Sequence, residues 1–129
     1  MNAQLTRNQA LVLSELSKAG APLSAYTILD RLRDEGFRAP LQVYRALDKL
    51  IEFGLIHRLE SLNAFVTCAH DHHHHALAAF AICETCGKAD EFSDAAIEER
   101  LHAWTHANGF KPSKTTIEIR GVCAGCSAA

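Results

Sequence analysis

The fold is decided by residues 40–68, which read PLQVYRALDKLIEFGLIHRLESLNAFVTC. Pro40 suits the first turn of a helix, and Gly54 suits its end. Between these two residues, apolar side chains recur at helical spacing. This apolar stripe consists of Val43, Leu47, Leu50 and Ile51. The stretch therefore begins with an amphipathic helix that turns one face toward a core.

Two strand-like runs follow this helix, over residues 55–60 and 64–68, and together they predict a β-hairpin. A tight turn at Leu62-Asn63 would pair residues whose numbers add up to 125. His57 would then lie directly opposite Cys68, with Cβ atoms about 5 Å apart. Such a pair suits two ligands of one metal ion. A buried cysteine beside a hydrogen-bonded histidine, without a metal, is the alternative interpretation.

Two further helices are expected before residue 40. Thr6 and Gln9, three residues apart, form a capping box, and Ser24 is a candidate N-cap for the second helix. Gly36 would end that second helix. The expected core positions are Ala10, Leu13 and Leu16 in the first helix and Ile28, Leu29 and Leu32 in the second. Three short helices followed by a β-hairpin is the order of a winged helix-turn-helix.

Polar side chains lie opposite the apolar stripe of the third helix. Gln42, Arg45 and Lys49 recur there at i, i+3 and i+7. In a winged helix-turn-helix, this helix enters the major groove, where Arg45 is the best candidate for a base contact. Lys49 and Arg58 suit phosphate contacts instead. The alternative is an ordinary solvated helix face, which such residues usually form.

A second set of elements is expected after residue 75. Apolar runs at 76–82 and 89–92 predict two strands, and Ser93 is the expected N-cap of a helix. The apolar face of that helix comprises Ile97, Leu101 and Trp104. A last strand is predicted by the alternating residues Ile117 and Ile119. A small antiparallel sheet with one helix has a thin core, so this part of the chain needs a metal, a partner or both.

Two C-x-x-C motifs stand at the ends of predicted strands. They read Cys83-Glu84-Thr85-Cys86-Gly87 and Cys123-Ala124-Gly125-Cys126. This spacing lets two sulfurs of each motif converge, and two such motifs close a tetrahedral thiolate site for zinc. Because a closed site has no position for water, we expect this zinc to be structural. A redox role is disfavoured, because no thioredoxin-like βαβ pattern surrounds either motif.

The composition is that of a soluble globular chain of 129 residues with a formal net charge of −2. No apolar run approaches the roughly 18 residues of a membrane span. The first residues lack the basic and then apolar regions of a secretory signal, so we expect a cytoplasmic protein. In that reducing compartment, paired cysteines bind metals more often than they form disulfides. Residues 1–66 contain eight Lys/Arg and seven Asp/Glu, for a net charge of +1, whereas residues 67–129 contain five Lys/Arg and eight Asp/Glu, for a net charge of −3.

A histidine-rich segment lies between the two halves. Its histidines are His70, His72, His73, His74 and His75. One of them, together with Glu91, would complete a tetrahedral S/N/N/O site with His57 and Cys68. A mixed ligand set of this kind suits zinc, whereas an iron sensor more readily uses nitrogen and oxygen ligands alone. Zinc in such a site would fix the wing against the metal-rich half, and would thereby link zinc concentration to DNA affinity.

Taken together, these motifs resemble the ferric uptake regulator (Fur) superfamily. The resembling segments are SAY at 24–26, VYRAL at 43–47, GLIHRLES at 54–61, AFV at 64–66, CETCG at 83–87 and residues 117–126. They cover nearly the whole chain, and they look most like the zinc uptake regulator (Zur) branch. Resemblance to this branch implies a homodimer that represses zinc-acquisition genes by binding AT-rich palindromic operator DNA when loaded with zinc.

The resemblance also implies roles for individual residues. The DNA contacts fall on Tyr26 and Arg45, and Tyr44 of the same VYRAL motif is a further candidate. The structural zinc falls on the four C-x-x-C cysteines. The regulatory ligands fall on His57, Cys68 and Glu91. The remaining regulatory histidine falls nearest Ala76, so a shift of one residue selects His75, with His73 in reserve.

A third metal site is a weaker implication of the resemblance. It would use residues of the histidine-rich segment and one carboxylate, namely His70, His72, His73 and Glu98. The late histidine of the family pattern corresponds to Thr115 here, which departs from the pattern. His102 and His106 are one helical turn apart, and we expect both on the surface.

The sequence thus predicts an α+β protein with three parts. These are a winged-helix DNA-binding domain with its wing (1–68), a histidine-rich hinge (69–75) and a small α/β dimerisation and metal-binding domain (76–129). The predicted function is zinc-sensing repression. An iron- or peroxide-responsive regulator of the same family is the first alternative, which Cys68 argues against, and a zinc-storage protein is the second. An enzyme is not expected, because the sequence contains no HExxH or comparable catalytic spacing.

Overall fold

The computed structural model describes residues 4–68 and 77–127. The chain divides into two compact units, residues 1–73 and 74–129. The histidine-rich segment 69–75 lies outside the described residues, so its predicted role as a hinge stays a prediction. Among the described helices, none has both the length and the apolar character required to cross a membrane.

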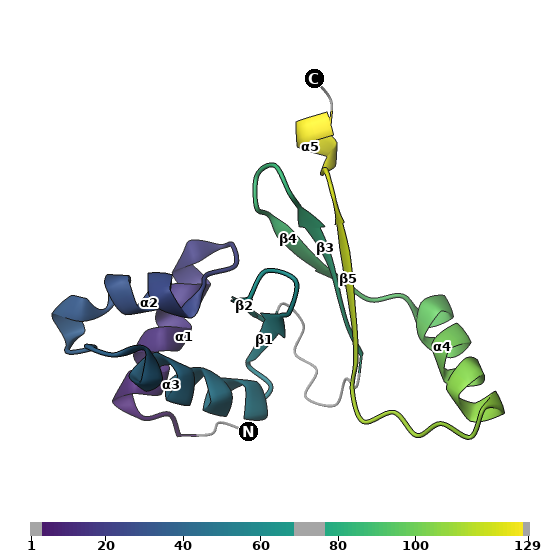
Figure 1. Ribbon diagram of the computed structural model, residues 1–129, viewed down its shortest axis with the longest axis horizontal. Helices are drawn as coiled ribbons and strands as arrows, with labels where there is room; N and C mark the ends of the chain where they lie inside the picture. The colour runs from purple at the N-terminus through teal and green to yellow at the C-terminus, as the bar shows by residue number, and fades with distance from the viewer. Residues whose placement is uncertain (1–3, 69–76, 128–129) are drawn as a thin grey trace. The chain divides into compact units, whose positions relative to one another are not determined.

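The first unit consists of helices followed by a two-stranded wing. Its helical elements are α1 (Arg7–Ala19), α2 (Ala25–Arg31), the short 3-10 helix η1 (Arg33–Glu35) and α3 (Pro40–Glu52). The wing pairs β1 (Ile56–Leu59) with β2 (Ala64–Thr67) in antiparallel fashion (Figure 1). This order is the predicted winged helix-turn-helix.

In the first unit the predicted helix starts are confirmed, and local side chains satisfy the first backbone N–H groups of α1 and α2. Thr6 and Gln9 form the reciprocal capping box of α1, with bonds of 3.0 and 3.2 Å. The Ser24 hydroxyl accepts from the backbone N–H of Thr27 at 3.1 Å and begins α2. Pro40 is the first residue of α3. Gly36 ends η1 with φ 98°, whereas α2 itself already ends at Arg31.

The core of the first unit lies between the three helices and the wing. The fully buried side chains of α3, Val43, Leu47 and Leu50, are the predicted ones, and Ile51 is partly buried. The predicted stripe of α2, Ile28, Leu29 and Leu32, is also buried. In α1 the prediction was partly wrong, because Ala10 is exposed and the buried residues are Val12 and Leu16. These two residues are four positions apart and share one face of the helix.

The wing has a different register from the predicted one. His57 lies opposite Val66, not Cys68, because the chain turns over four residues, 60–63, instead of two. Asn63 adopts a left-handed conformation with φ 49°, which asparagine tolerates better than most residues. The backbone N–H of Cys68 donates to the carbonyl of Leu55 at 3.0 Å, so Cys68 extends the pairing beyond β2.

The second unit is a mixed three-stranded sheet with one long helix. The strands β3 (Leu77–Cys83), β4 (Ala89–Phe92) and β5 (Thr115–Gly121) stand in the order β4-β3-β5. β4 pairs antiparallel with β3, whereas β5 pairs parallel with it, so the prediction of a purely antiparallel sheet was wrong. The reason is the crossover through α4 (Ala95–Ala107), which returns the chain in the direction of β3. A short helix, α5 (Ala124–Ser127), follows β5.

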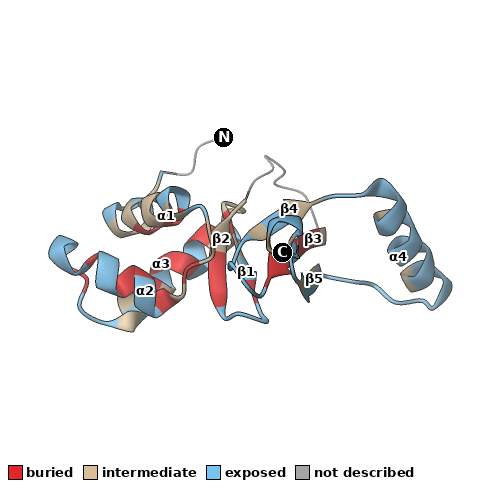
Figure 2. Ribbon diagram, turned by 90° about the horizontal axis from the view of Figure 1, so that it is seen from above, coloured by how far each residue is buried: buried red, intermediate tan, exposed pale blue. Residues whose placement is uncertain are grey.

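Most side chains of α4 are exposed, as Figure 2 shows by its pale blue ribbon. The helix begins at the N-cap Asp94, not at the predicted Ser93, because the Asp94 carboxylate accepts from two backbone N–H groups at 2.9 and 3.3 Å. Its predicted apolar face is present but exposed: Ile97 is 38%, Leu101 39% and Trp104 60% accessible. The buried residues described in this unit lie in β3, and they are Ala78, Ala79, Phe80, Ile82 and Cys83.

Candidate metal centres and nucleic-acid interface

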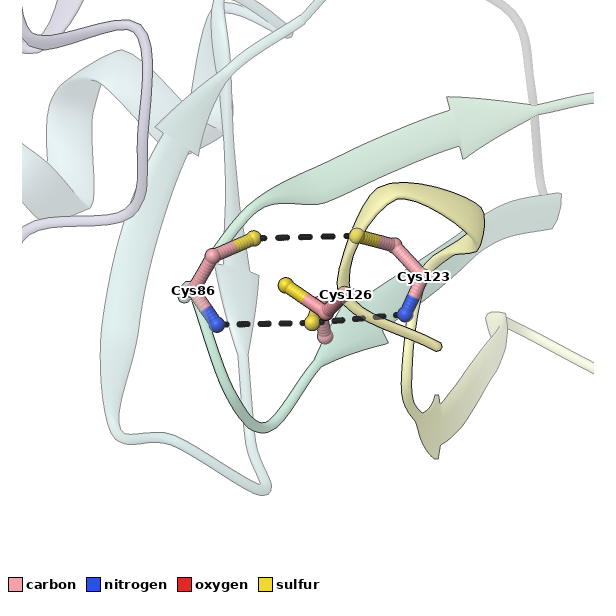
Figure 3. Close-up of side chains that lie close together, drawn as sticks. Cys86, Cys123 and Cys126 are labelled. Atoms are coloured by element: carbon pink, nitrogen blue, oxygen red, sulfur yellow. Dashed lines mark hydrogen bonds between the residues drawn. The ribbon is translucent and has the colours of Figure 1, made fainter. Parts of the chain in front are cut away.

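Four cysteines converge at one end of the sheet in the second unit. Cys83 ends β3, and Cys86 lies in the turn that leads to β4. Cys123 follows β5, and Cys126 lies in α5 (Figure 3). Their sulfurs all lie within 4.8 Å of one another. The parallel pairing of Cys83 with Gly121 explains this convergence, because it brings both C-x-x-C motifs to the same end of two adjacent strands.

The backbone of both motifs is arranged around the sulfur of Cys83. Backbone N–H groups of Cys123, Cys86 and Thr85 donate to it at 3.3, 3.4 and 3.4 Å. These donors, Cys123 first, lower the pKa of the Cys83 thiol from 9.0 to about 5. Hydrogen bonds with the sulfurs of Cys123 and Cys83 raise the pKa of Cys126 to about 12. The lowered pKa favours the thiolate form of Cys83, which is the form that binds a metal ion.

The geometry of the four sulfurs fits a zinc ion. In a tetrahedral site with Zn–S bonds of about 2.3 Å, two sulfurs lie about 3.8 Å apart. The sulfurs of Cys86 and Cys123 are 3.9 Å apart. All four ligand positions would be filled by sulfur, which is the pattern of structural and not of catalytic zinc. An ion held there would join β3 to the segment after β5.

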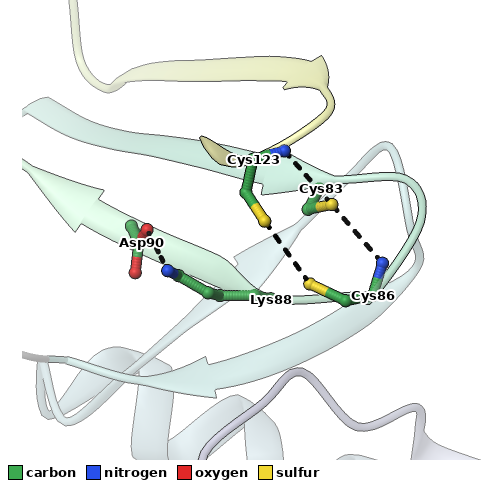
Figure 4. A network of polar contacts seen from close by, with 5 residues as sticks. All are labelled: Cys83, Cys86, Lys88, Asp90 and Cys123. Carbon is green, nitrogen blue, oxygen red and sulfur yellow. Dashed lines mark hydrogen bonds and ion pairs between the residues drawn. The ribbon is translucent and has the colours of Figure 1, made fainter. Parts of the chain in front are cut away.

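A lysine–aspartate pair lies beside the cysteine cluster, as Figure 4 shows. Lys88 Nζ is 3.5 Å from the carboxylate of Asp90. Asp90 raises the pKa of Lys88, and negative charge at Cys123 and Cys86 contributes to the same shift. A positive side chain here offsets part of the charge of a four-thiolate site. Lys88 is not among the residues that the sequence motifs indicated, although it directly follows Gly87 of the C-x-x-C-G motif.

His57 and Cys68 lie on the same face of the wing despite the changed register. Residues 57 and 66 are opposite, and Cys68 is two positions further along, so His57 and Cys68 are diagonal neighbours. A ring nitrogen of His57 and the sulfur of Cys68 are within 4.8 Å. Both residues are half-buried. The two side chains can therefore serve one metal ion, although the directly opposed pair was a wrong prediction.

The other candidate ligands are distributed over both units and the segment between them. Glu91 lies in β4, opposite Phe80, and is half-buried. Glu98 lies in the first turn of α4, and His102 and His106 are exposed further along this helix. The expected ligands of the histidine-rich segment, His70, His72, His73 and His75, lie outside the described residues.

The candidate DNA-binding side chains gather on α2, α3 and the wing. Tyr26 on α2 is 62% exposed, and Arg45 on α3 is exposed. Tyr44 is partly buried and packs against the core. Arg58 donates to the side-chain oxygen of Asn63 at 3.0 Å, which holds its guanidinium near the wing turn.

Two of the predicted DNA contacts on α3 have other partners. Gln42 Oε1 accepts from the backbone N–H groups of Arg38 and Ala39 at 2.6 and 3.0 Å, so Gln42 caps the helix. Lys49 forms an ion pair with Glu52 at 3.4 Å. Arg45 is therefore the side chain of α3 best placed to reach a base among those predicted.

The sequence matches the ferric uptake regulator family over residues 1–120. The chain belongs to this family. Among curated members, the zinc uptake regulation protein of Escherichia coli (strain K12) is 39% identical over 127 residues, which is 97% of this chain and 74% of that protein. The name of this relative states that it regulates zinc uptake.

Two solved structures of family members resemble this chain over nearly its full length. A zinc uptake regulator complexed with zinc and DNA has a TM-score of 0.91 at 37% identity, covering 98% of this chain and 85% of that one. The crystal structure of holo XcZur has a TM-score of 0.89 at 42% identity, covering 100% and 90%. The resemblance to the Fur family, inferred from motifs, is thus confirmed.

Proposed function

We propose that this chain is a zinc-sensing transcriptional repressor, which binds operator DNA as a zinc-loaded homodimer and represses zinc-uptake genes. The observation that carries the proposal is the proximity of His57 and Cys68, whose ligand atoms lie within 4.8 Å of each other on the wing of a DNA-binding unit. A thiolate among the sensing ligands favours zinc over iron. The resemblance to a zinc uptake regulator solved with zinc and DNA supports the same assignment.

We infer from the family resemblance that the regulatory site takes ligands from both parts of the chain. His57 and Cys68 come from the wing, Glu91 from β4, and a histidine of the segment between the units, His75 or in reserve His73, completes the set. A zinc ion shared in this way restricts how the two units move relative to each other. It thereby stabilises the arrangement that binds DNA, and the differential affinity of zinc for this arrangement supplies the coupling.

The second unit forms the homodimer, and its exposed apolar residues support this role. Ile97, Leu101 and Trp104 lie on one face of α4, and Phe110 lies next to Trp104 with ring centroids 6.5 Å apart. Among the described strands, β5 is at the edge of its sheet and exposes Ile119. A second copy would cover this surface and would present two winged units to the halves of an AT-rich palindrome.

The deciding experiment measures zinc-dependent operator binding and zinc content in the variant Cys68→Ser. We expect about one zinc per chain to remain, bound by the four-cysteine cluster. The zinc concentration needed for DNA binding should rise by more than roughly 10- to 100-fold, because that is the loss of metal affinity when only a residue behind a ligand is removed. Glu91→Gln should act in the same way. Glu99→Gln, the same change at an exposed residue of α4, serves as the matched control and should bind as the unchanged protein does.

Two results would refute this assignment. Retained zinc-dependent repression in Cys68→Ser would show that the wing does not sense zinc. Activation of the unchanged protein by ferrous iron at concentrations equal to or below those of zinc would favour the iron- or peroxide-responsive alternative instead. The competition is best measured with both metals in the same buffered titration.

A further inference from the structure

Leu41 is an exposed apolar residue in the first turn of α3. Of the residues of this helix, all of which the structure describes, Leu41 is the one large apolar side chain that is mostly exposed, at 56%. The other large aliphatic residues of α3 face the core or are partly buried, as Val43 and Leu47 are. An exposed leucine at this place is therefore not explained by the packing of its own unit.

Leu41 and Arg45 occupy the same face of α3. They are four positions apart, so the two side chains lie one above the other on the helix surface. Both are exposed. Any DNA groove that receives the Arg45 side chain also receives Leu41, one turn closer to the start of the helix.

The charges along α3 decide which end of the helix approaches DNA. Asp48 and Glu52, both exposed, lie on the same face in its second half. Glu52 also pairs with Lys49 at 3.4 Å, which lowers the net positive charge of that half. The first turn carries no acidic side chain, and its backbone N–H groups carry partial positive charge. Phosphates therefore repel the second half and attract the first, so that Leu41 and Arg45 lie deepest in the groove.

We propose that Leu41 reads the 5-methyl group of a thymine in each half of the operator. This inference rests on the proposed function, since it assumes that α3 enters the major groove of operator DNA. The thymine methyl is the apolar group that a base pair presents in the major groove, and it is recognised by apolar contact. Leu41 thus adds a preference for thymine to the guanine preference that Arg45 supplies.

The chemistry of a leucine side chain explains why it selects against other bases. It offers no hydrogen bond, so a base edge with an unpaired donor or acceptor loses its water on contact and gains nothing in return. The edges of guanine and cytosine have such groups at this position of the groove, whereas thymine covers part of its edge with a methyl group. Leu41 therefore favours thymine by attraction and disfavours G·C pairs by desolvation.

The test removes the methyl group from the DNA and leaves everything else unchanged. A duplex is first selected from a random library with the zinc-loaded protein, and each thymine of the selected site is then replaced singly by deoxyuridine. We expect one thymine, at the same position in both halves of the site, to be sensitive to this replacement. There, the loss of the buried methyl group should weaken binding by about fourfold per half-site. Leu41→Ala should bind the thymine and deoxyuridine duplexes equally at that position. Leu62→Ala, an equally conservative change of the exposed leucine at the wing turn, should keep the fourfold difference.

Three outcomes overturn the inference. If no replacement by deoxyuridine weakens binding of the unchanged protein, no thymine methyl is read. If the weakening persists in Leu41→Ala, another side chain such as Tyr44 reads the methyl. If the zinc-loaded protein selects no duplex at all, the proposed function itself has failed, and this result differs from the first two because it appears before any deoxyuridine is introduced.

Discussion

At the scale of single residues, several side chains of α3 have different roles from those that their spacing indicates. Gln42, Arg45 and Lys49 share one polar pattern in the sequence. In the folded chain, Gln42 caps the helix, Lys49 pairs with Glu52, and Arg45 is exposed. The spacing predicts a face, but it does not show which members of that face are already engaged within the protein.

Replacing Arg45 by alanine should remove a base contact while the fold persists. We expect specific operator affinity to fall by about 1–3 kcal/mol, the range for losing a bidentate contact to a base. Binding to unrelated duplex DNA should change much less. Titrations with both duplexes at one fixed salt concentration measure the difference.

Arg33→Ala is the control for this change, because Arg33 is an exposed arginine of η1 that pairs with Asp30 and lies outside α3. It should leave specific affinity nearly unchanged. Equal losses in Arg33→Ala and Arg45→Ala would mean that Arg45 contributes only general positive charge and reads no base.

At the scale of helices and strands, the sequence predicted most elements and missed how some of them pair. The starts of α1 and α2 depend on side chains within three residues, such as Thr6 and Ser24, so local sequence is sufficient. The wing register depends on whether Asn63 adopts a left-handed conformation, which the hydrophobic pattern does not reveal. The direction of β5 depends on the crossover through α4, which is a property of the whole second unit.

The candidate metal sites likewise have some features that the sequence predicts and others that it does not. The cysteine cluster was predictable, because C-x-x-C spacing and strand ends are visible in sequence. The arrangement of three backbone N–H groups around Cys83, and the Lys88–Asp90 pair beside the cluster, depend on three-dimensional placement. The alignment of His57 with Cys68 on one face was predicted from a wrong register, and it survives because a shift of two residues preserves the face.

Loss of the four-cysteine site should unfold the second unit. Zinc bound in such sites contributes about 10–16 kcal/mol of apparent binding energy, which equals or exceeds the roughly 5–15 kcal/mol stability of a whole domain. We expect the double variant Cys123→Ser and Cys126→Ser to lose one zinc per chain. Trp104, the single tryptophan, lies on the surface that the proposed dimer covers, so its fluorescence should then shift toward that of a fully solvated side chain.

Metal analysis and far-ultraviolet circular dichroism accompany the fluorescence measurement. Cys68→Ser provides the comparison, because it removes a thiol outside the cluster and should retain both the structural zinc and the fold. A double variant that stays folded with unchanged zinc content would contradict the structural role of the cluster.

In the molecule as a whole, most of the exposed large apolar side chains among the described residues belong to the second unit. Its described buried residues lie in β3, whereas large apolar side chains of α4 and β5 are exposed. Water contact with Trp104, Phe110 and Ile119 is unfavourable, and burial of such side chains against a second copy would stabilise the proposed dimer.

The variant Trp104→Glu should therefore shift the protein from dimer to monomer. A buried carboxylate without a partner is strongly unfavourable in an apolar interface, so the dissociation constant should rise by at least about 100-fold. Analytical ultracentrifugation over a range of concentrations measures this shift. Ala103→Glu introduces the same charge on a different face of α4, and it should leave the dimer intact.

A shift of equal size in Ala103→Glu would indicate that added charge, and not the loss of the tryptophan surface, weakens association. A dimer of unchanged stability in Trp104→Glu would place the interface elsewhere on the chain.

The parallel pairing of β3 with β5 also bears on the order in which the chain folds. Leu77 pairs with Thr115 and Cys83 with Gly121, so this ladder forms only after a long intervening segment, including α4, has been synthesised. Pairing between residues so distant in sequence is slow, because closing a long loop costs chain entropy before any contact is made. Zinc bound by both C-x-x-C motifs would close the same loop, because it would hold the ends of β3 and β5 together at Cys83 and Cys123. A cell short of zinc would then delay not only repression by this protein but also the maturation of each newly made copy.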